Sequence, residues 1–237
     1  MNIHRITYNP KENSATLYFI GCNFRCLCCY WKQIYGKVNF NNLSFLDLKE
    51  TIKILESVLP QRVYILSGDP KPNPEFDRLP KVLSDNFKCE VRLQTNGYNL
   101  PDLEGISHIS VSIKAVNDDL HKRYTGRSNK KSLENFQMIY KSGIELSASS
   151  VYIPDLFDRD EIEEIAKFIA NVDKNIPYRV IGYMRVDGLD FKEPSYEEVK
   201  EVAKRCSKYL KNITFSRPNR EGYTGIVDLF TNNLKRC

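Results

Sequence analysis

Six short apolar runs alternate with segments of helical periodicity, and this alternation constrains the fold more than any other feature. The runs have strand-like length and are bounded by turn residues. They cover Ala15–Ile20, Arg62–Ser67, Glu90–Thr95, His108–Lys114, Ile144–Ile153 and Tyr178–Met184. Strands separated by helices indicate parallel βαβ units with right-handed crossovers. Six of them predict an α/β fold with an open or partial barrel rather than a closed eight-stranded one.

Helical segments are expected near residues 46–59, 133–141, 158–169 and 195–206. Pro60 stops the first, and Gly143 closes the second at a position where a left-handed residue is favoured. Residue pairs typical of helix N-termini, Asp158 with Glu161 and Ser195 with Glu198, mark the starts of the last two. In such folds the loops after the strand C-termini carry the chemistry.

Composition and organisation favour one globular domain over residues 1–237. The chain is 41% hydrophobic and 27% charged, which argues against a disordered or coiled-coil protein. It contains no fixed-period repeat and no Gly/Ser linker. No run of about 18 apolar residues is present, and the N-terminal residues lack the apolar stretch of a secretory signal. We therefore expect a cytoplasmic protein with no membrane partner.

The charge balance is mildly basic, with a formal net charge of +5. The stretches between His121 and Leu133 and between Glu201 and Glu221 contain several Lys and Arg and no acidic residue. A solvated face explains such stretches, and so does contact with an acidic protein or a nucleic acid. Nucleic acid is therefore not excluded as a partner.

Four of the seven cysteines lie between Cys22 and Cys29, directly after the first predicted strand. An odd total of seven cysteines, four of them packed together, is a poor disulfide framework. The spacing of Cys22, Cys26 and Cys29 allows three thiolates to bind three irons of a cubane cluster, which leaves the fourth iron open. A structural zinc site normally needs four ligands, and no second CxxC lies downstream. Cys89 and Cys206 are expected to be small buried hydrophobic residues.

The pattern Cys22-x-x-x-Cys26-x-x-Cys29 after a first strand resembles the signature of the radical S-adenosylmethionine (radical SAM) superfamily. Ser67-Gly68-Asp69-Pro70, at the end of the second strand, looks like that superfamily's Gly-Gly-Glu-Pro motif. Further matches to glycyl-radical-enzyme activases also follow strand ends or continue from them: Gln94–Gly97, Ser112–Lys114, Val151–Pro154 and Lys114–Gly126. The resemblance covers roughly residues 14–186 and leaves a C-terminal extension over about 187–237.

The resemblance implies a partial (β/α)6 radical SAM barrel and a shared first half-reaction. One [4Fe–4S] cluster with three Cys ligands binds S-adenosylmethionine (AdoMet) at its open iron and cleaves it reductively. The products are methionine and a 5′-deoxyadenosyl radical that abstracts hydrogen from a substrate. Cys22, Cys26 and Cys29 are thereby expected as catalytic metal ligands.

The resemblance also implies the residues that contact AdoMet. Ser67, Gly68 and Asp69 are expected near the methionine ammonium group, and Lys114 is expected to pair with the methionine carboxylate. Other expected contacts to AdoMet come from Tyr30, Thr95, Asn96, Ser112, Tyr152 and Met184.

Four positions depart from the family pattern. Asp69 replaces the usual glutamate and is one methylene shorter. Cys28 stands where an aromatic residue is usual and could compete as a ligand. Gln94 and Ser112 replace aspartates that hold a monovalent cation in activases of the pyruvate formate-lyase type, so such a cation is doubtful here.

The substrate is expected to be a glycine of a partner glycyl-radical enzyme, with a ferredoxin- or flavodoxin-type protein as electron donor. The alternatives are modification of RNA, a peptide or a small molecule. A non-enzymatic iron–sulfur protein would require the AdoMet motifs to be coincidental. The residue pattern assigns no role to Cys237 and no oligomeric state.

Overall fold

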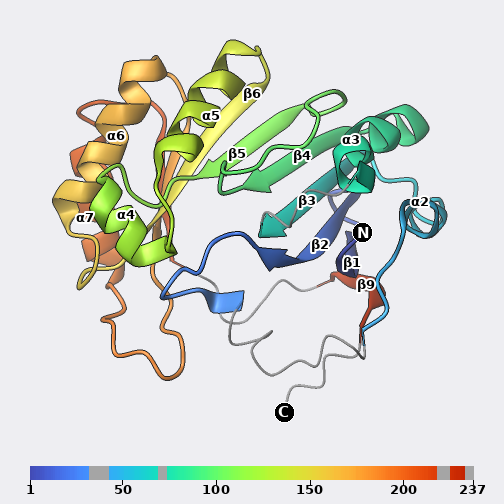
Figure 1. Ribbon diagram of the computed structural model, residues 1–237, viewed down its shortest axis with the longest axis horizontal. Helices are drawn as coiled ribbons and strands as arrows, with labels where there is room; N and C mark the ends of the chain where they lie inside the picture. The colour runs from blue at the N-terminus through green and yellow to red at the C-terminus, as the bar shows by residue number, and fades with distance from the viewer. Residues whose placement is uncertain (32–42, 69–73, 218–224, 233–237) are drawn as a thin grey trace. The chain divides into compact units, whose positions relative to one another are not determined.

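The computed structural model describes residues 1–31, 43–68, 74–217 and 225–232. The chain divides into two compact units (Figure 1). The first unit comprises residues 1–23, 34–109 and 222–237, and the second comprises residues 24–33 and 110–221. The cysteine-rich segment crosses this division, with Cys22 in the first unit and the other three cysteines in the second.

The first unit is built on an open sheet with strand order β4-β3-β2-β1-β9. Its strands are β1 (Ile3–Asn9), β2 (Ser14–Cys22), β3 (Arg62–Gly68), β4 (Glu90–Thr95) and β9 (Val227–Thr231). Strands β2, β3 and β4 run parallel, whereas β1 pairs antiparallel with both β2 and β9. Ile6, Leu17 and Ile65 are fully buried in its core. The parallel strands place their carboxyl ends at one edge of this sheet.

Helices α2 (Leu48–Leu55) and α3 (Pro74–Phe87) belong to the first unit. Asp47 begins α2 with a capping box to Glu50. A proline, Pro80, lies inside α3. The backbone of Gly105 passes so near that a Cβ there would lie 2.7 Å from the Cα of Lys81. Its φ of +83° also favours glycine, so both space and backbone conformation require Gly105.

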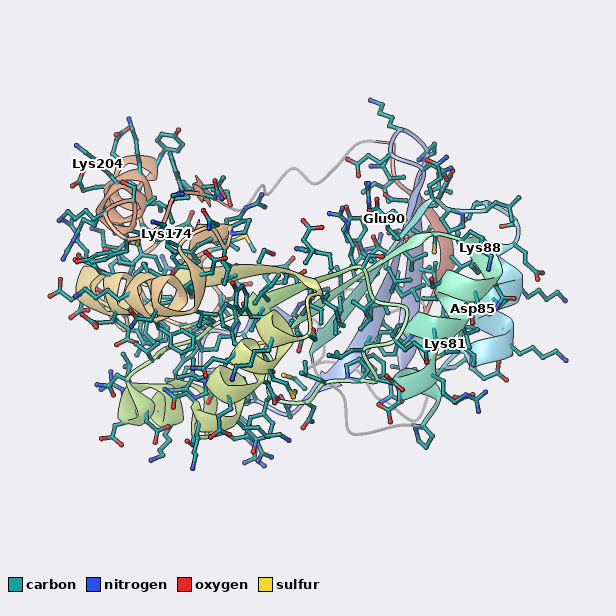
Figure 2. The ribbon with its side chains drawn as sticks, turned by 90° about the horizontal axis from the view of Figure 1, so that it is seen from above. Lys81, Asp85, Lys88, Glu90, Lys174 and Lys204 are labelled. Carbon is teal, nitrogen blue, oxygen red and sulfur yellow. The ribbon has the colours of Figure 1, made fainter. Side chains whose placement is uncertain are left out.

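A tight turn connects α3 to β4. Lys88 occupies it with a φ of 50°, which is uncommon for a residue other than glycine, and Glu90 then begins the strand. Figure 2 labels both residues, together with Lys81 and Asp85 on the exposed face of α3. Lys81 pairs with Asp85 at 3.5 Å and with Glu104 at 2.5 Å, which connects α3 to the segment before β5.

The second unit continues the alternation of strands and helices with strand order β8-β7-β6-β5. Strands β6, β7 and β8 are parallel. The elements are β5 (His108–Ser112, with residues 110–112 in this unit), α4 (Asp118–Thr125), α5 (Lys130–Lys141), β6 (Glu145–Tyr152), α6 (Arg159–Asp173), β7 (Tyr178–Gly182), α7 (Tyr196–Cys206) and β8 (Ile213–Ser216). Phe136, Ile165 and Val199 are fully buried in its core.

The six predicted strands are confirmed as β2 to β7, with ends that differ by at most two residues. The predicted helices correspond to α2, α5, α6 and α7. The capping pair Ser195 and Glu198 is confirmed. Asp158 caps α6, but the Glu161 carboxylate turns to the backbone of another loop instead of back to Asp158.

Several elements were not predicted. The structure adds strands β1 and β8 and helices α3 and α4. The C-terminal region adds β8 beside β7 and β9 beside β1, so it extends the sheets of both units. Cys89 and Cys206 are buried, as predicted. Among the described helices none is both long and apolar enough to cross a membrane.

Candidate active site

Three predicted site residues meet at the carboxyl edge of the first unit's parallel strands. Cys22 ends β2 and pairs in register with Gly68, the last residue of β3. Asn96 directly follows β4, and its amide Nδ2 donates to Cys22 Sγ at 3.8 Å and to Asn23 Oδ1 at 2.8 Å. The fold therefore brings together the ends of three successive strands, as the βαβ pattern predicted.

The segment after β4 is a tight turn with its polar groups engaged. Gly97 has a φ of 75° and donates its N–H to the Thr95 hydroxyl at 2.9 Å. The Asn96 side-chain oxygen accepts from Tyr98 N at 2.9 Å. Thr95 and Asn96 are both buried, so the turn fixes the Asn96 amide toward Cys22 and Asn23.

The Ser67-Gly68-Asp69 motif is described only in part. Ser67 and Gly68 end β3 as predicted. Asp69, the predicted partner of an ammonium group, lies outside the described residues. Its role stays a prediction from the sequence.

In the second unit, Ser112 ends β5 and Lys114 follows two residues later. Lys114 Nζ donates to Ser112 Oγ at 2.9 Å, so the hydroxyl orients the ammonium group. The intervening Ile113 is fixed on both sides: its N–H donates to Ser149 O, and its carbonyl accepts from Ser150 Oγ, each at 2.9 Å. The backbone that carries Lys114 is therefore held in place, and its ammonium group has a fixed hydrogen-bond partner in Ser112.

Two further predicted AdoMet contacts lie at the ends of β6 and β7. Tyr152 is buried at the last position of β6, and its carbonyl accepts from Tyr183 N at 3.0 Å. Met184 follows Tyr183 and is half-buried, two residues beyond the end of β7. The structure thus links the β6 and β7 ends through the Tyr183–Tyr152 bond.

The other three clustered cysteines lie on a loop of residues 24–31, called the cysteine loop below. Cys26 and Cys28 are buried, Cys29 is half-buried, and Tyr30 is exposed. Tyr183 makes a side-chain hydrogen bond with Cys28, and burial together with this contact raises the pKa of the Tyr183 hydroxyl. Cys28 therefore has a partner of its own among the described residues.

Sequence reasoning did not identify the residues that hold the segment after Lys114. Glu161 Oε1 accepts from Val116 N at 2.6 Å and from Asn117 N at 3.2 Å. Burial raises the pKa of the Glu161 carboxyl, and these two N–H donors oppose that rise. On the other side, Asn129 Nδ2 donates to Val116 O at 2.6 Å and to Ala115 O at 3.2 Å. These contacts join residues far apart in sequence, so local patterns carry no signal for them.

The donor chemistry of the cysteine-rich segment fits an iron–sulfur cluster. None of the six described cysteines forms a disulfide, and cysteine thiolate is the ligand type that iron–sulfur clusters use. Burial, together with the nearby thiols of Cys26, Cys28 and Cys29, raises the pKa of the Tyr124 hydroxyl well above its usual range. No group of three or more His, Cys, Asp or Glu side chains in the described residues is gathered to hold a metal ion. The set Cys22, Cys26 and Cys29 therefore stays a prediction.

Three curated proteins illustrate what the chain is similar to. A Methanocaldococcus jannaschii protein named as a candidate glycyl-radical enzyme activating enzyme is 30% identical, and the match covers 89% of this chain and 84% of that protein. The pyruvate formate-lyase-activating enzyme of Clostridium pasteurianum is 27% identical over 84% of this chain and 90% of that protein. A GTP 3′,8-cyclase of Petrotoga mobilis is 23% identical over 90% of this chain and 72% of that protein.

Two solved structures share the fold. A radical SAM methyltransferase from Sphaerobacter thermophilus superimposes with a TM-score of 0.67 at 16% identity, over 89% of this chain and 69% of that one. Streptococcus suis SuiB bound to S-adenosylmethionine superimposes with a TM-score of 0.66 at 17% identity, over 84% of this chain and 48% of SuiB. The chain thus spans about half the length of SuiB. These likenesses confirm the mixed α/β, open-barrel fold predicted from the strand pattern.

The family assignment rests on the match along the chain. The Radical SAM superfamily profile matches residues 17–169, which include the cysteine-rich segment and strands β3 to β6. The same residues carry all of the predicted site positions except Met184. The chain therefore belongs to the radical SAM superfamily, whose members bind a [4Fe–4S] cluster and S-adenosylmethionine.

Proposed function

We propose that this radical SAM enzyme is an activase that takes a hydrogen atom from a glycine of a partner glycyl-radical enzyme. The observation that carries this proposal is the similarity to the Methanocaldococcus jannaschii and Clostridium pasteurianum proteins. In each case the similarity extends over most of this chain and most of the relative. The cyclase match has lower identity and covers less of its relative. A small molecule such as GTP, an RNA or a peptide is the alternative substrate.

Cys22, Cys26 and Cys29 are the proposed ligands of the cluster. When bound, the cluster and AdoMet together supply reductive cleavage of AdoMet to methionine and a 5′-deoxyadenosyl radical that abstracts hydrogen. The Asn96 amide faces Cys22 and holds the end of β2 through Asn23. The thiols lie on a short segment after a strand, which is where this fold type carries its chemistry.

Lys114 is the proposed partner of the methionine carboxylate. Lys114 is half-buried as a whole residue, and its ammonium group donates to the Ser112 hydroxyl at 2.9 Å. A half-buried ammonium binds a carboxylate more strongly than one in water because the surrounding dielectric is lower. Ser67, Gly68, Asp69 and Thr95 are proposed near the amino group and ribose, and Tyr30, Tyr152 and Met184 near the adenine.

The electron donor is proposed to approach the cysteine loop. Leu27, Tyr30 and Trp31 are exposed by 44%, 46% and 38% beside the buried thiols. Exposed Arg25 adds positive charge to the same loop. An acidic ferredoxin- or flavodoxin-type protein complements such a surface in charge.

The test combines two products of the reaction. Anaerobically reconstituted protein, dithionite and AdoMet should form 5′-deoxyadenosine, and addition of the partner enzyme should give a glycyl-radical signal in electron paramagnetic resonance (EPR). Cys26→Ala should abolish both products, whereas Cys206→Ala, which removes a buried thiol outside the cysteine-rich segment, should retain them. The partner with its radical glycine changed to alanine should give no signal.

Two results would contradict the activase assignment while preserving the family chemistry. One is 5′-deoxyadenosine formation without a glycyl radical in any glycyl-radical enzyme of the same organism. The other is stimulation of AdoMet cleavage by GTP or an RNA with transfer of the hydrogen atom from that molecule. Deuterium carried from labelled substrate into 5′-deoxyadenosine identifies the donor of the hydrogen atom.

A further inference from the structure

The sheet of the second unit has two faces of different character. On β7, Tyr178 and Val180 are buried, and a Cβ on Gly182 would lie 2.8 Å from a methyl group of Val199 in α7. Alternate residues of a strand point to the same face, so these three positions point to the face that α7 covers. Arg179 lies between them, points to the opposite face and is exposed. This opposite face is called the Arg179 face below.

A row of polar side chains crosses the Arg179 face. Ser149 of β6 pairs in register with Arg179, which in turn pairs with Thr214 of β8. The hydrogen bond from Ile113 N to Ser149 O places Ser149 beside Ser112 of β5. Paired residues of neighbouring strands point to the same face. The four polar side chains from β5 to β8 therefore form one row, called the polar row below.

Two members of the polar row have donors that the protein leaves unused. Ser149 is only 5% exposed, and its hydroxyl has no hydrogen-bond partner within the described residues. Arg179 donates from Nε to Thr214 Oγ1 at a long 3.4 Å, and it forms no ion pair with any described residue. A buried hydroxyl usually has a partner, and a guanidinium presents five N–H donors. These two adjacent residues are therefore equipped to bind a ligand.

The polar row is separated from the strand ends by an apolar pair. Ser112 belongs to the row, but its hydroxyl already accepts from Lys114, the proposed partner of the AdoMet carboxylate. Two residues further along their strands, half-buried Val151 and Ile181 pair in register. Two residues of a strand span about 6.6 Å. A ligand that reaches Arg179 from the carboxyl ends of the strands thus passes an apolar surface first.

We propose that Ser149 and Arg179 bind a carboxylate of the substrate, supplied by an Asp or Glu side chain in the peptide segment that carries the partner's glycine. This inference rests on the proposed function and names a contact to its substrate. One guanidinium beside one hydroxyl matches a carboxylate with a single negative charge, which Arg binds in a fixed geometry. A phosphate group would carry more charge than this one cation neutralises. The methylene groups of the acidic side chain would pack on Val151 and Ile181.

The experiment measures glycyl-radical formation by EPR at increasing concentrations of the partner enzyme, with AdoMet and dithionite in excess. Arg179→Met should raise the half-saturating concentration of the partner roughly 10- to 100-fold, the effect of removing a hydrogen bond to a charged group. Arg159→Met removes an exposed arginine at the start of α6 and should leave this concentration unchanged.

Ser149→Ala tests the buried hydroxyl. It should raise the half-saturating concentration roughly three- to tenfold, and it should not lower the urea midpoint, because the hydroxyl has no partner within the described residues to lose. Ser132→Ala is the matched control. It removes another buried hydroxyl without a described partner, from helix α5, and should leave the half-saturating concentration unchanged.

A double-mutant cycle identifies the carboxylate. Acidic residues near the radical glycine of the partner are changed one at a time to their amides. One such change should weaken activation by the wild-type protein and have no further effect on activation by Arg179→Met. The inference is overturned if Arg179→Met keeps the wild-type half-saturating concentration, or if every amide change affects both proteins equally.

The failure of the proposed function gives a different result. A wild-type protein that cleaves AdoMet but produces no glycyl radical in the partner refutes the proposed function and this inference with it. Stimulation of AdoMet cleavage by GTP or an RNA that Arg179→Met abolishes would assign Arg179 to a phosphate group instead, and would likewise overturn the carboxylate site.

Discussion

Glu161 Oε1 lies 2.6 Å from the backbone nitrogen of Val116 and thereby fixes the loop that connects Lys114 to helix α4. The same oxygen accepts from Asn117 N, the N-cap residue of α4. Since α4 also carries the cysteine loop at its other end, one buried carboxylate helps to place both Lys114 and the thiols.

The first prediction concerns this carboxylate. Glu161→Ala should lower the free energy of unfolding by about 2–3 kcal/mol, because two buried backbone N–H groups lose their acceptor. Glu164→Ala on the exposed face of the same helix should cost less than about 0.5 kcal/mol. Urea denaturation measures both. Equal losses in the two variants would show that the Glu161 contacts contribute little.

The second prediction concerns the Asn96 amide. Asn96→Asp keeps the oxygen that accepts from Tyr98 N but removes the donor to Asn23 and Cys22. A carboxylate would also face the Asn23 oxygen and the Cys22 sulfur, so iron bound after reconstitution should fall to roughly half or less. Asn86→Asp on α3 is the control, and iron and sulfide analysis gives the result. Full iron content in Asn96→Asp would exclude a role for the amide in holding Cys22.

The third prediction concerns Lys114. Lys114→Met should weaken AdoMet binding by roughly 10- to 100-fold, the effect of removing one hydrogen bond to a charged group. Lys130→Met, which removes an exposed lysine 4.0 Å from Glu134, should leave affinity unchanged. Isothermal titration calorimetry on the reconstituted protein measures both affinities. Unaltered binding by Lys114→Met would assign the carboxylate to another residue.

The fourth prediction is a pH dependence of stability. Burial lowers the pKa of His4 to about 4 from 6.5, and the nearby Arg5 adds to this effect. Between these pH values the unfolded chain binds more protons than the folded one, so stability rises with pH and is lost as pH falls from 6.5 toward 4. The pKa of His121 is also lowered by burial and acts in the same direction.

His4→Gln should therefore reduce the loss of unfolding free energy between pH 7 and pH 4 by an amount on the order of 2 kcal/mol. Thermal unfolding at several pH values measures this slope. A variant that keeps the full slope would assign the pH dependence to His121 or to carboxyl groups.

The strand pattern predicted the fold well, because the fold follows from the order of parallel strands. Cys22, Gly68 and Asn96 were expected at one sheet edge, and they lie there. Helix α4 was not predicted as a helix because its eight residues are mostly polar and lack an apolar stripe. Its residues stand out in the sequence through their similarity to activases and through the basic stretch that begins at His121.

The supporting contacts could not be predicted, because they depend on tertiary packing. Glu161 had the spacing of a capping partner for Asp158, yet its carboxylate bonds to a loop 44 residues away in sequence. Helix α3 contains Pro80, and the backbone of Gly105 passes close to the Pro80 carbonyl. The spacing of two residues shows only which local hydrogen bonds are possible. Whether a side chain forms one depends on the partners that the tertiary fold brings near it.

The fifth prediction separates the two adjacent cysteines. The Cys28 thiol is buried and bonded to Tyr183, whereas half-buried Cys29 has the spacing of a cluster ligand. Cys28→Ser should therefore keep iron content and the visible absorption of the cluster, because serine still offers Tyr183 a hydrogen-bond acceptor. Cys29→Ser should lose most of both, because a hydroxyl is a poor substitute for a thiolate at iron. The reverse pattern would move the third ligand to Cys28, and full iron content in both variants would mean that either cysteine can complete the set.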